Sequence, residues 1–562
     1  MLPAKIKNMI HWPFFNLFSK EVWAFTSLTF LSIFVLIRFV NLVPEVDDNF
    51  FFSSDDPQFQ SEQRIDELFI RKDTQLIISA TGDIRSSAYT KNVSTLSEAL
   101  LKIEGVSSVN SITHFGPNNV KAALNSPLWK RLIISDDQRS TNLIVLLEEN
   151  RSSEIIPKVE RAISRFSKPD FQLKAAGLPY VIELIKRNLQ RDLKIFTSLA
   201  VIIFGLFIFK LFHSKGVLLG TILCCFNACI WTLMILQLMH VPLGLLTANL
   251  GTIIFVMTLS HIIFLTYNWR NLLADGNKEG SVEKAVDLTF TASFWSMLTT
   301  LLGFVSLMSV PAKPLRELGL SGSIGAVIAI IVAYGIFPHF LRVAHLRIKE
   351  NNFETIQNMT FIYLDKRRKY IATGIFVAML LALPGLLNIK SDPSLLSYFS
   401  KSSEIYQGFS YIDHNGGSSP LLLVVRSKDD QPLNTSNTYN KLSNLQEALE
   451  QHRAVGSVIS LPVLIAQAKK TALGWIFPKE WLLDVMASEK YDKISKSFVT
   501  ENRKYGLFLL RMREIHRSSP RLKIVDEIQN IARVHGFNPE IVGGIYNLQG
   551  HLSKLVASSL IT

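Results

Sequence analysis

The sequence predicts an α-helical polytopic membrane protein that carries two α+β domains outside the membrane. Hydrophobic residues make up 48% of the 562 residues, and 19% are charged. This mixture is too apolar for an average soluble protein and too charged for membrane spans alone. Seven apolar stretches approach the roughly 20 residues that a membrane-spanning helix needs, and two long, more polar segments separate them. Spans joined to large water-exposed domains account for these observations.

The first predicted span follows a basic, aromatic leader, residues 1–21, and no small-residue cleavage site comes after it. We therefore expect a retained anchor rather than a signal peptide. Five of the later spans fall within residues 194–342 and are predicted to form one bundle. In chain order the predicted spans are 22–43, 194–212, 216–239, 243–266, 288–309, 319–341 and 370–388.

Basic residues gather in the leader, after the sixth span at Arg342, and in the cluster 366–369 before the seventh span. Cytoplasmic flanks of membrane proteins carry the excess of Lys and Arg. The leader and a linker, residues 343–369, are therefore predicted to be cytoplasmic. The segments 44–193 and 389–552 then lie on the outer side of the membrane.

The two outer segments share an internal repeat, because residues 96–112 align without gaps to residues 445–461. Identical positions include Glu98, Ala99, Leu100, Val106, Ser108, Val109 and Ser111, which recur as Glu447, Ala448, Leu449, Val455, Ser457, Val458 and Ser460. The pattern predicts equivalent amphipathic helices, 96–105 and 445–454, each followed by a turn and a strand. Further apolar strands flank each copy, at 74–80, 141–149, 420–425 and 504–512. We expect two small α+β modules of the ferredoxin-like type.

The composition argues against several other classes. The net charge of +13 comes with basic residues beside spans and without a nucleic-acid-binding motif, so we expect no nucleic-acid partner. The cysteines Cys224, Cys225 and Cys229 share one predicted span, which cannot build a disulfide framework. No nucleophile–base arrangement, metal-ligand cluster or phosphate loop stands out in either outer segment. We therefore expect neither an enzyme nor a bound metal or cofactor.

One ionisable residue, His261, lies inside a predicted span. At 100° per residue it shares a narrow helix stripe with Thr247, Gly251, Ile254 and Thr258. Small and polar side chains inside a span usually face other helices rather than lipid. A histidine there either joins helices through a hydrogen bond or carries a proton, because imidazole titrates near neutral pH. Both interpretations stay open on the residues alone.

The most specific motif is SMLTTLLGFVSLMSVPAKPLRELGLSGSIGAVIA, residues 296–329. It resembles the corresponding segment of the RND superfamily of exporters, in its MMPL-like branch, whose middle spans also resemble a sterol-sensing domain. The stretch DPSLLSYF, 392–399, resembles the family's start of an outer domain. GLPYVIELI, 177–185, and GIYNLQGHL, 544–552, resemble its domain exits. The matching residues of the long motif are Thr299, Thr300, Gly303, Phe304, Ser306, Leu307, Pro314, Leu315, Arg316, Gly319 and Gly325.

The resemblance implies a fold and a function. Family members usually have twelve spans in two pseudo-symmetric halves, and they use the proton-motive force to export hydrophobic or amphiphilic molecules. His261 takes the position of the family's relay aspartate, with Thr258 one turn away as its hydrogen-bond neighbour. The residues assigned to bundle packing and coupling are Thr247, Gly251, Thr299, Thr300, Gly319, Gly322 and Gly325. We expect a multi-pass protein of the bacterial inner membrane with large periplasmic domains, and a lipid or other amphiphile as its substrate.

The second pseudo-symmetric half is incomplete in this sequence, since residues 553–562 only begin an eighth span. We expect a truncated chain. The alternative is a natural half that pairs with another copy or with a complementary chain. Because the tenth span and an acidic partner for His261 are both missing, a non-transporting lipid sensor or membrane scaffold is the second functional hypothesis.

Overall fold

The computed structural model describes residues 20–39, 56–69, 75–114, 119–148, 151–244, 246–274, 280–310, 312–344, 367–386, 392–470, 496–515 and 517–559. The basic leader, most of the predicted linker 343–369 and the end of the predicted eighth span lie outside these residues. The chain divides into two compact units. Residues 1–46 and 186–390 form what we call the bundle unit, and residues 47–185 and 391–562 form the α/β unit.

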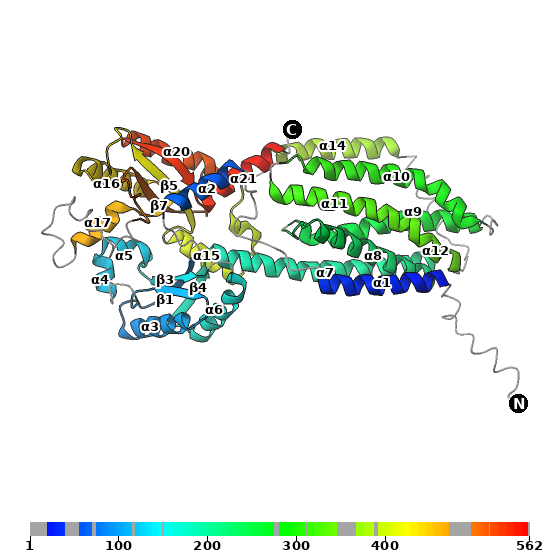
Figure 1. The fold of residues 1–562 in the computed structure, drawn as a ribbon, viewed down its shortest axis with the longest axis horizontal. Helices are drawn as coiled ribbons and strands as arrows, with labels where there is room; N and C mark the ends of the chain where they lie inside the picture. Colours follow the sequence, from blue (N-terminus) through cyan, green and yellow to red (C-terminus); the bar gives the residue numbers. More distant parts are fainter. Residues whose placement is uncertain are drawn as a thin grey trace, which may run out of the picture. The chain divides into compact units, whose positions relative to one another are not determined.

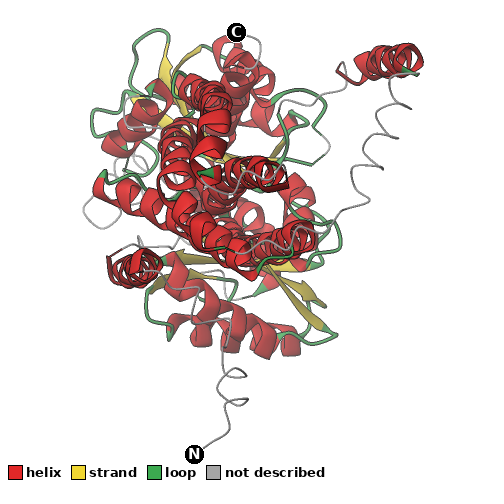
Figure 2. Cartoon of the chain, turned by 90° about the vertical axis from the view of Figure 1, so that its right-hand side faces the viewer, coloured by secondary structure: helices red, strands yellow, loops and turns green. Residues whose placement is uncertain are grey.

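The α/β unit contains two sheets of four strands each, drawn in yellow in Figure 2. In the first module the strands lie in the order β2-β3-β1-β4, and all neighbours are antiparallel. The sequence of elements, strand–helix–strand–strand–helix–strand, is that of a ferredoxin-like fold. Its elements are β1 (Gln75–Gly82), α3 (Ser87–Leu101), β2 (Val106–Asn110), β3 (Ser140–Leu147), α6 (Ser152–Phe166) and β4 (Phe171–Ala176). Two short helices, α4 (Val120–Asn125) and α5 (Pro127–Leu132), precede β3.

The second module repeats this arrangement, with the strand order β6-β7-β5-β8. Its elements are β5 (Ser419–Ser427), α16 (Ser436–Gln451), β6 (Val455–Ile459), β7 (Tyr505–Met512), α20 (Arg521–Val534) and β8 (Phe537–Gly543). The helix α17 (Leu461–Lys469) follows β6. The expectation of two ferredoxin-like modules is therefore confirmed. Sequence reasoning did not locate the second helix and last strand of each module, or the short helices α4, α5 and α17.

The repeated stretch keeps the same internal hydrogen bond in both modules. In the first, the hydroxyls of Ser97 and Ser111 lie 2.9 Å apart, both fully buried. At the aligned positions of the second, the hydroxyl of Ser460 donates to the side-chain oxygen of Gln446. Each pair ties the middle of a helix to the end of the following strand. The helices α3 and α16 begin earlier than predicted and also end earlier, because a tight turn that contains Gly105 in the first module precedes the strand.

Both faces of each sheet are covered, which explains why the first strand of each module is apolar without alternation. On β5, Leu421 and Leu423 face the module's own helices, whereas Leu422 and Val424 pack against Ile65 of helix α2 (Pro57–Leu68). On the first sheet, helix α15 (Glu404–His414) takes the corresponding place beside β4. The two modules thus exchange helices: α2 precedes the first module in sequence but covers the second, and α15 does the reverse (Figure 1).

Polar contacts also join the two modules within the α/β unit. Arg131, at the end of α5, makes a two-pronged ion pair with Glu450 of α16, with N–O distances of 2.6 and 2.9 Å. The hydroxyl of Ser126 donates to Gln467 of α17 at 2.5 Å. Two parallel hydrogen bonds between an arginine and a carboxylate stabilise the contact and also fix the relative orientation of the two groups. The exchanged helices and these contacts make the two modules one structural unit.

A buried cluster of charges holds the start of the second module. Arg521, at the first turn of α20, is 1% exposed and donates to both oxygens of Glu514, at 3.1 and 2.7 Å. Its guanidinium also donates to Asp392, which accepts further hydrogen bonds from Arg517 at 2.7 Å and from the hydroxyl of Ser553 at 3.1 Å. Asp392 precedes the short 3₁₀ turn η4 (Leu395–Tyr398), and Ser553 lies on α21 (Ile545–Ser559). The cluster therefore links Asp392, where the chain enters this module, to Ser553 on α21, the helix by which the chain leaves it.

Each module ends at a position that only glycine can occupy, because a side chain there would clash with the backbone. Gly177 and Gly544 have φ of 139° and 87°. A Cβ on Gly177 would lie 2.8 Å from the carbonyl oxygen of Gln75, and one on Gly544 would lie 2.6 Å from that of Pro420. Gln75 and Pro420 occupy the same position of the first strand in the two modules. The backbone turns sharply there into α7 (Leu178–Phe212) and α21, as the resemblance of 177–185 and 544–552 to domain exits implied.

The bundle unit contains long apolar helices, of which α8, α9, α10 and α11 pack side by side (Figure 1). In the described residues, six helices are long and apolar enough to cross a membrane. The helix α1 (Lys20–Phe39) contributes a shorter apolar segment, Thr29–Arg38. The six are α7, α8 (Lys215–Leu238), α9 (Leu250–Ala274), α10 (Ser281–Leu307), the continuous run of α11 (Lys313–Ile331), η3 (Val332–Ile336) and α12 (Phe337–Val343), and α14 (Arg368–Leu386).

The helix ends differ from the predicted spans, because hydropathy marks the apolar centre of a span and not the polar turns at its ends. The largest difference is in the second span, where α7 starts 16 residues before the predicted 194–212, at Leu178. The fourth span begins later than expected: η2 (Thr247–Asn249) precedes α9, which then runs to Ala274. Glu283, near the start of α10, pairs with Arg342, near the end of α12, at 2.8 Å.

Candidate functional site in the helix bundle

The candidate site centres on His261, which lies on α9 and is 7% exposed. α9 packs against α8, α10 and α11. Its neighbours along the predicted stripe are also buried, with Ile254 and Thr258 both at 0%. An ionisable side chain placed inside a bundle rather than toward lipid is costly to insert and is by default a functional candidate.

The expected hydrogen bond between Thr258 and His261 is not present. The hydroxyl of Thr258 donates instead to the carbonyl oxygen of Ile254, four residues earlier, at 2.8 Å. Thr232 of α8 and Thr289 of α10 do the same with Ala228 and Ala285. In an apolar environment, a hydroxyl gains most by satisfying its proton within its own helix. Thr258 therefore contributes a small, buried surface near His261 rather than a partner for its ring.

The close neighbour of His261 is Tyr334. The two rings pack edge to face, with centroids 6.4 Å apart and planes inclined by 62°. Tyr334 lies in the middle of η3, a single turn of π-helix. Pro338 follows it by four residues and has no N–H, so the carbonyl of Tyr334 cannot receive the usual α-helical hydrogen bond. The wider turn fits this loss, and such turns are frequent at functional sites.

Tyr334 connects His261 to α10. Its hydroxyl lies 2.5 Å from that of Ser293, which is 3% exposed. Its ring also packs edge to face on Phe290, with centroids 5.3 Å apart. A histidine, a tyrosine and a serine on three elements are therefore joined inside an apolar bundle by one ring contact and one hydrogen bond. Sequence reasoning missed Tyr334 and Ser293, although Gly335 and Pro338 mark a helix irregularity beside the tyrosine.

The glycines of the long motif lie where α11 approaches its neighbours. A Cβ on Gly322 would lie 2.3 Å from the ring of Phe304 on α10, and one on Gly325 would lie 2.7 Å from Ile254 on α9. A Cβ on Gly319 would lie 2.6 Å from the carbonyl oxygen of Phe304. By contrast, nothing lies within 4 Å of a Cβ on Gly251. The three glycines of α11 thus allow close packing of α11 against α9 and α10.

The threonines predicted to take part in packing differ from one another. Thr247 is 2% exposed and donates to the carbonyl oxygen of Gly244 at 3.3 Å. Thr299 and Thr300 both donate to the carbonyl oxygen of Ser296 on their own helix, and Thr299 is exposed. Thr300 is half-buried, and the expected part of these two threonines in bundle packing stays a prediction.

The described residues hold no group of three metal-ligating side chains. Cys224 and Cys225 are fully buried among apolar side chains of α8, and the thiol of Cys229 donates to the carbonyl oxygen of Gly251 at 3.2 Å. What the site offers chemically is proton exchange at an imidazole, next to hydroxyls that can donate and accept hydrogen bonds.

Fold and site define a class: a multi-pass membrane protein whose helix bundle contains a buried histidine and which carries two ferredoxin-like modules with exchanged helices. The chain belongs to the MMPL family, a family of membrane transporters, whose model matches residues 51–352, more than half of the sequence.

Two known proteins are similar to the chain. A membrane protein of Methanocaldococcus jannaschii is 24% identical over 276 residues, which cover 46% of this chain and 71% of the relative. A heavy metal efflux pump solved by X-ray crystallography is 13% identical, with a TM-score of 0.37. That alignment covers 89% of this chain and 54% of the pump chain, so the chain spans about half the length of the pump chain.

Proposed function

We propose that the protein exports a lipid-like or other amphiphilic molecule and that the proton-motive force drives this export. Membership in a family of membrane transporters supports the proposal. The observation that carries it is the buried imidazole of His261 against Tyr334, since a proton-driven transporter needs a titratable group inside its bundle. The location proposed with it is the bacterial inner membrane, with the α/β unit on the periplasmic side.

In this proposal His261 binds a proton from the outer side and releases it to the inner side. Protonation makes both ring nitrogens of His261 donors and adds a positive charge, which strengthens its attraction to nearby hydroxyl oxygens. Release of the proton removes that attraction. Because Tyr334 and Ser293 belong to two other helical elements, the change at one ring alters the contacts between α9, α10 and the π-helical turn. A transporter requires such a coupling between protonation and helix arrangement.

Proteoliposomes that contain the chain test the proposal. A fluorescent derivative of dodecyl phosphate serves as the amphiphile, and an internal pH-sensitive dye reports proton movement. We expect amphiphile movement to follow an imposed pH gradient and to stop when a protonophore dissipates it. Amphiphile that binds without any gradient-dependent movement would contradict export and would favour the second candidate, a lipid sensor or scaffold.

A further inference from the structure

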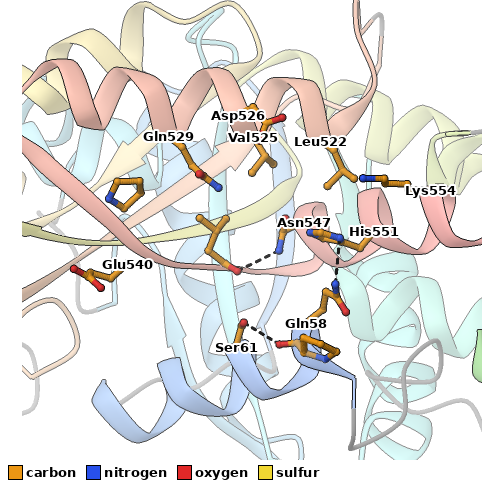
Figure 3. A pocket seen from close by; sticks show the side chains of 13 residues that line it. Gln58, Ser61, Leu522, Val525, Asp526, Gln529, Glu540, Asn547, His551 and Lys554 are labelled. Carbon is orange, nitrogen blue, oxygen red and sulfur yellow. Dashed lines mark hydrogen bonds between the residues drawn. The ribbon is translucent and has the colours of Figure 1, made fainter. Parts of the chain in front are cut away.

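Two surface cavities occupy equivalent places in the two modules. The first, of about 900 Å³, lies between α6, β4 and the first turn of α15. The second, of about 470 Å³, lies between α20, β8, α21 and the first turns of α2, as Figure 3 shows. In both, the helix before the last strand forms one wall, the last strand forms the floor, and the exchanged helix forms the other wall.

The lining positions match in detail. The helical wall of the first cavity includes Pro157, Glu160, Arg161 and Ser164, and that of the second includes Leu522, Val525, Asp526 and Gln529. The spacing is identical, and it places each set on one helix face. On the floors, Ala175 and Val542 pair with Ile78 and Leu423, which are equivalent positions of the first strands. The two cavities therefore derive from the same duplication as the modules.

Their chemistry has diverged. At the third position of the helical set the first cavity has Arg161, where the second has Asp526. The second also gains Glu540, an extra residue in a β-bulge of β8 that has no counterpart on β4. Its remaining side chains are mostly polar, and the ring of His551 is 3.3 Å from the amide of Gln58 (Figure 3).

The first cavity is amphipathic. Leu173, Ala175 and Ile405 are buried and give it an apolar floor. Lys168 and Arg161 line its rim, and within the described chain neither side chain has an ion-pair partner. Lys174 lies above the ring of Tyr411, with its nitrogen 4.7 Å from the ring centroid. The carboxylates that line the cavity are Glu160 and Glu404.

We infer that the first cavity binds an anionic amphiphile, with its charged head at Arg161 and Lys168 and the first part of its alkyl chain on the apolar floor. The inference rests on the proposed function and narrows its substrate class. Cations without protein partners favour an anionic head, because a charge-assisted hydrogen bond to an anion is worth more than one to water. The second cavity has the carboxylates of Asp526 and Glu540 and one cation, Lys554, so its lining is net negative and disfavours the same ligand by like-charge repulsion.

Photo-crosslinking of the full chain in a neutral detergent tests the inference. The probe is a 12-carbon alkyl phosphate with a diazirine on the chain, and mass spectrometry locates the label. We expect saturable labelling of peptides within 157–180 and 404–407, and none within 522–554. Unlabelled dodecyl phosphate should compete. Competition by inorganic phosphate alone, or equally well by dodecanol, would contradict recognition of head and chain together.

Charge substitutions sharpen the test. Arg161→Asp, which copies the chemistry of the second cavity, should lower labelling about tenfold, and Arg161→Lys should retain most of it. Asp526→Arg is the matched control and should leave labelling of the first cavity unchanged. Because Arg161 is exposed, none of these changes threatens folding. Labelling that Arg161→Asp leaves intact overturns the inference. If wild type is labelled but shows no gradient-driven movement of the amphiphile, binding in the first cavity is supported and the proposed export is wrong.

Discussion

His261 and Tyr334 contact each other edge to face inside the bundle, with ring centroids 6.4 Å apart. One ring is on a regular α-helix and the other is on a π-helical turn that Pro338 explains. In the proposed function, this pair is the contact through which protonation on α9 affects a different helix. The relationship makes several properties of the protein testable.

His261→Gln should abolish proton-coupled movement of the amphiphile, because glutamine keeps hydrogen bonding but cannot carry a proton at neutral pH. His261→Asp should retain part of the activity, because a carboxylate can titrate in the same place. The measurement is gradient-driven flux in proteoliposomes at matched protein content. If His261→Gln transports as well as wild type, His261 serves only to join helices.

Tyr334→Phe removes one hydroxyl and keeps the ring contact with His261. We expect coupled flux to fall at least tenfold, within the range by which positioned proton donors and acceptors affect rates. Ser293→Ala removes the other end of the same contact and should have a similar effect. The double substitution separates a shared path from two independent effects: effects that multiply fully would argue against a common contact.

Gly322→Ala should destabilise the bundle by about 1–3 kcal/mol, because the new methyl group would overlap the ring of Phe304. Gly303→Ala is the matched control, since nothing lies within 4 Å of a Cβ there. Thermal unfolding of the chain in detergent is the measurement. Equal midpoints for the two variants would mean that α10 and α11 are not held as closely as the structure has them.

Arg521→Met should destabilise the α/β unit by about 3–5 kcal/mol, because Asp392 and Glu514 would remain buried without their cation. Arg521→Lys is the conservative comparison and should recover only part of the loss, since an ammonium cannot bridge both carboxylates in the same geometry. Thermal unfolding followed by near-ultraviolet circular dichroism measures both. A midpoint for Arg521→Met equal to that of wild type would show that the cluster adds nothing to stability.

The same cluster predicts a dependence on pH. Burial alone would raise the pKa of Asp392, but Arg521 and Arg517 hold it below the ordinary 3.8. A lowered folded-state pKa stabilises the fold above the unfolded value, and the stabilisation is lost as the pH falls through the folded value. Unfolding midpoints of wild type should therefore fall below about pH 4. Asp392→Asn should be less stable at neutral pH and should show a weaker acid dependence.

Cysteine labelling tests which side of the membrane each part occupies. Asp170→Cys and Ser402→Cys introduce exposed thiols in the segments predicted to lie outside, and Lys284→Cys introduces one beside the inner end of α10. A membrane-impermeant maleimide should label the first two on intact cells and the third only after permeabilisation. Native Cys224, Cys225 and Cys229 lie inside the bundle and give a low background. Labelling of all three positions from one side would refute the topology.

Several features could be predicted from the sequence because their causes are local. Apolar length identified the helices of the bundle, and the aligned residues 96–112 and 445–461 identified two equivalent modules. His261 could be selected as a candidate because an ionisable ring in an apolar run is visible without a structure. Helix ends were less accurate, as α7 shows, because a polar amphipathic start carries no hydropathy signal.

Other features depend on contacts between residues far apart in sequence. The sequence suggested Thr258 as the partner of His261, but within one helix its hydroxyl can reach the carbonyl of Ile254, and the ring instead meets Tyr334, 73 residues away in the chain. The burial of Arg521 likewise follows from Asp392, which reaches it only in the folded chain.

By itself, the sequence determined the class of protein, its duplicated modules and the titratable residue in its bundle, since hydropathy, periodicity and residue chemistry act over a few helical turns. Only the tertiary structure decided which sheet α2 and α15 cover, which residue contacts His261, and that the two modules carry equivalent cavities lined by different charged side chains. These contacts depend on which surfaces bury the most apolar area and pair the most charges. Such surfaces form only when segments distant in the sequence pack together.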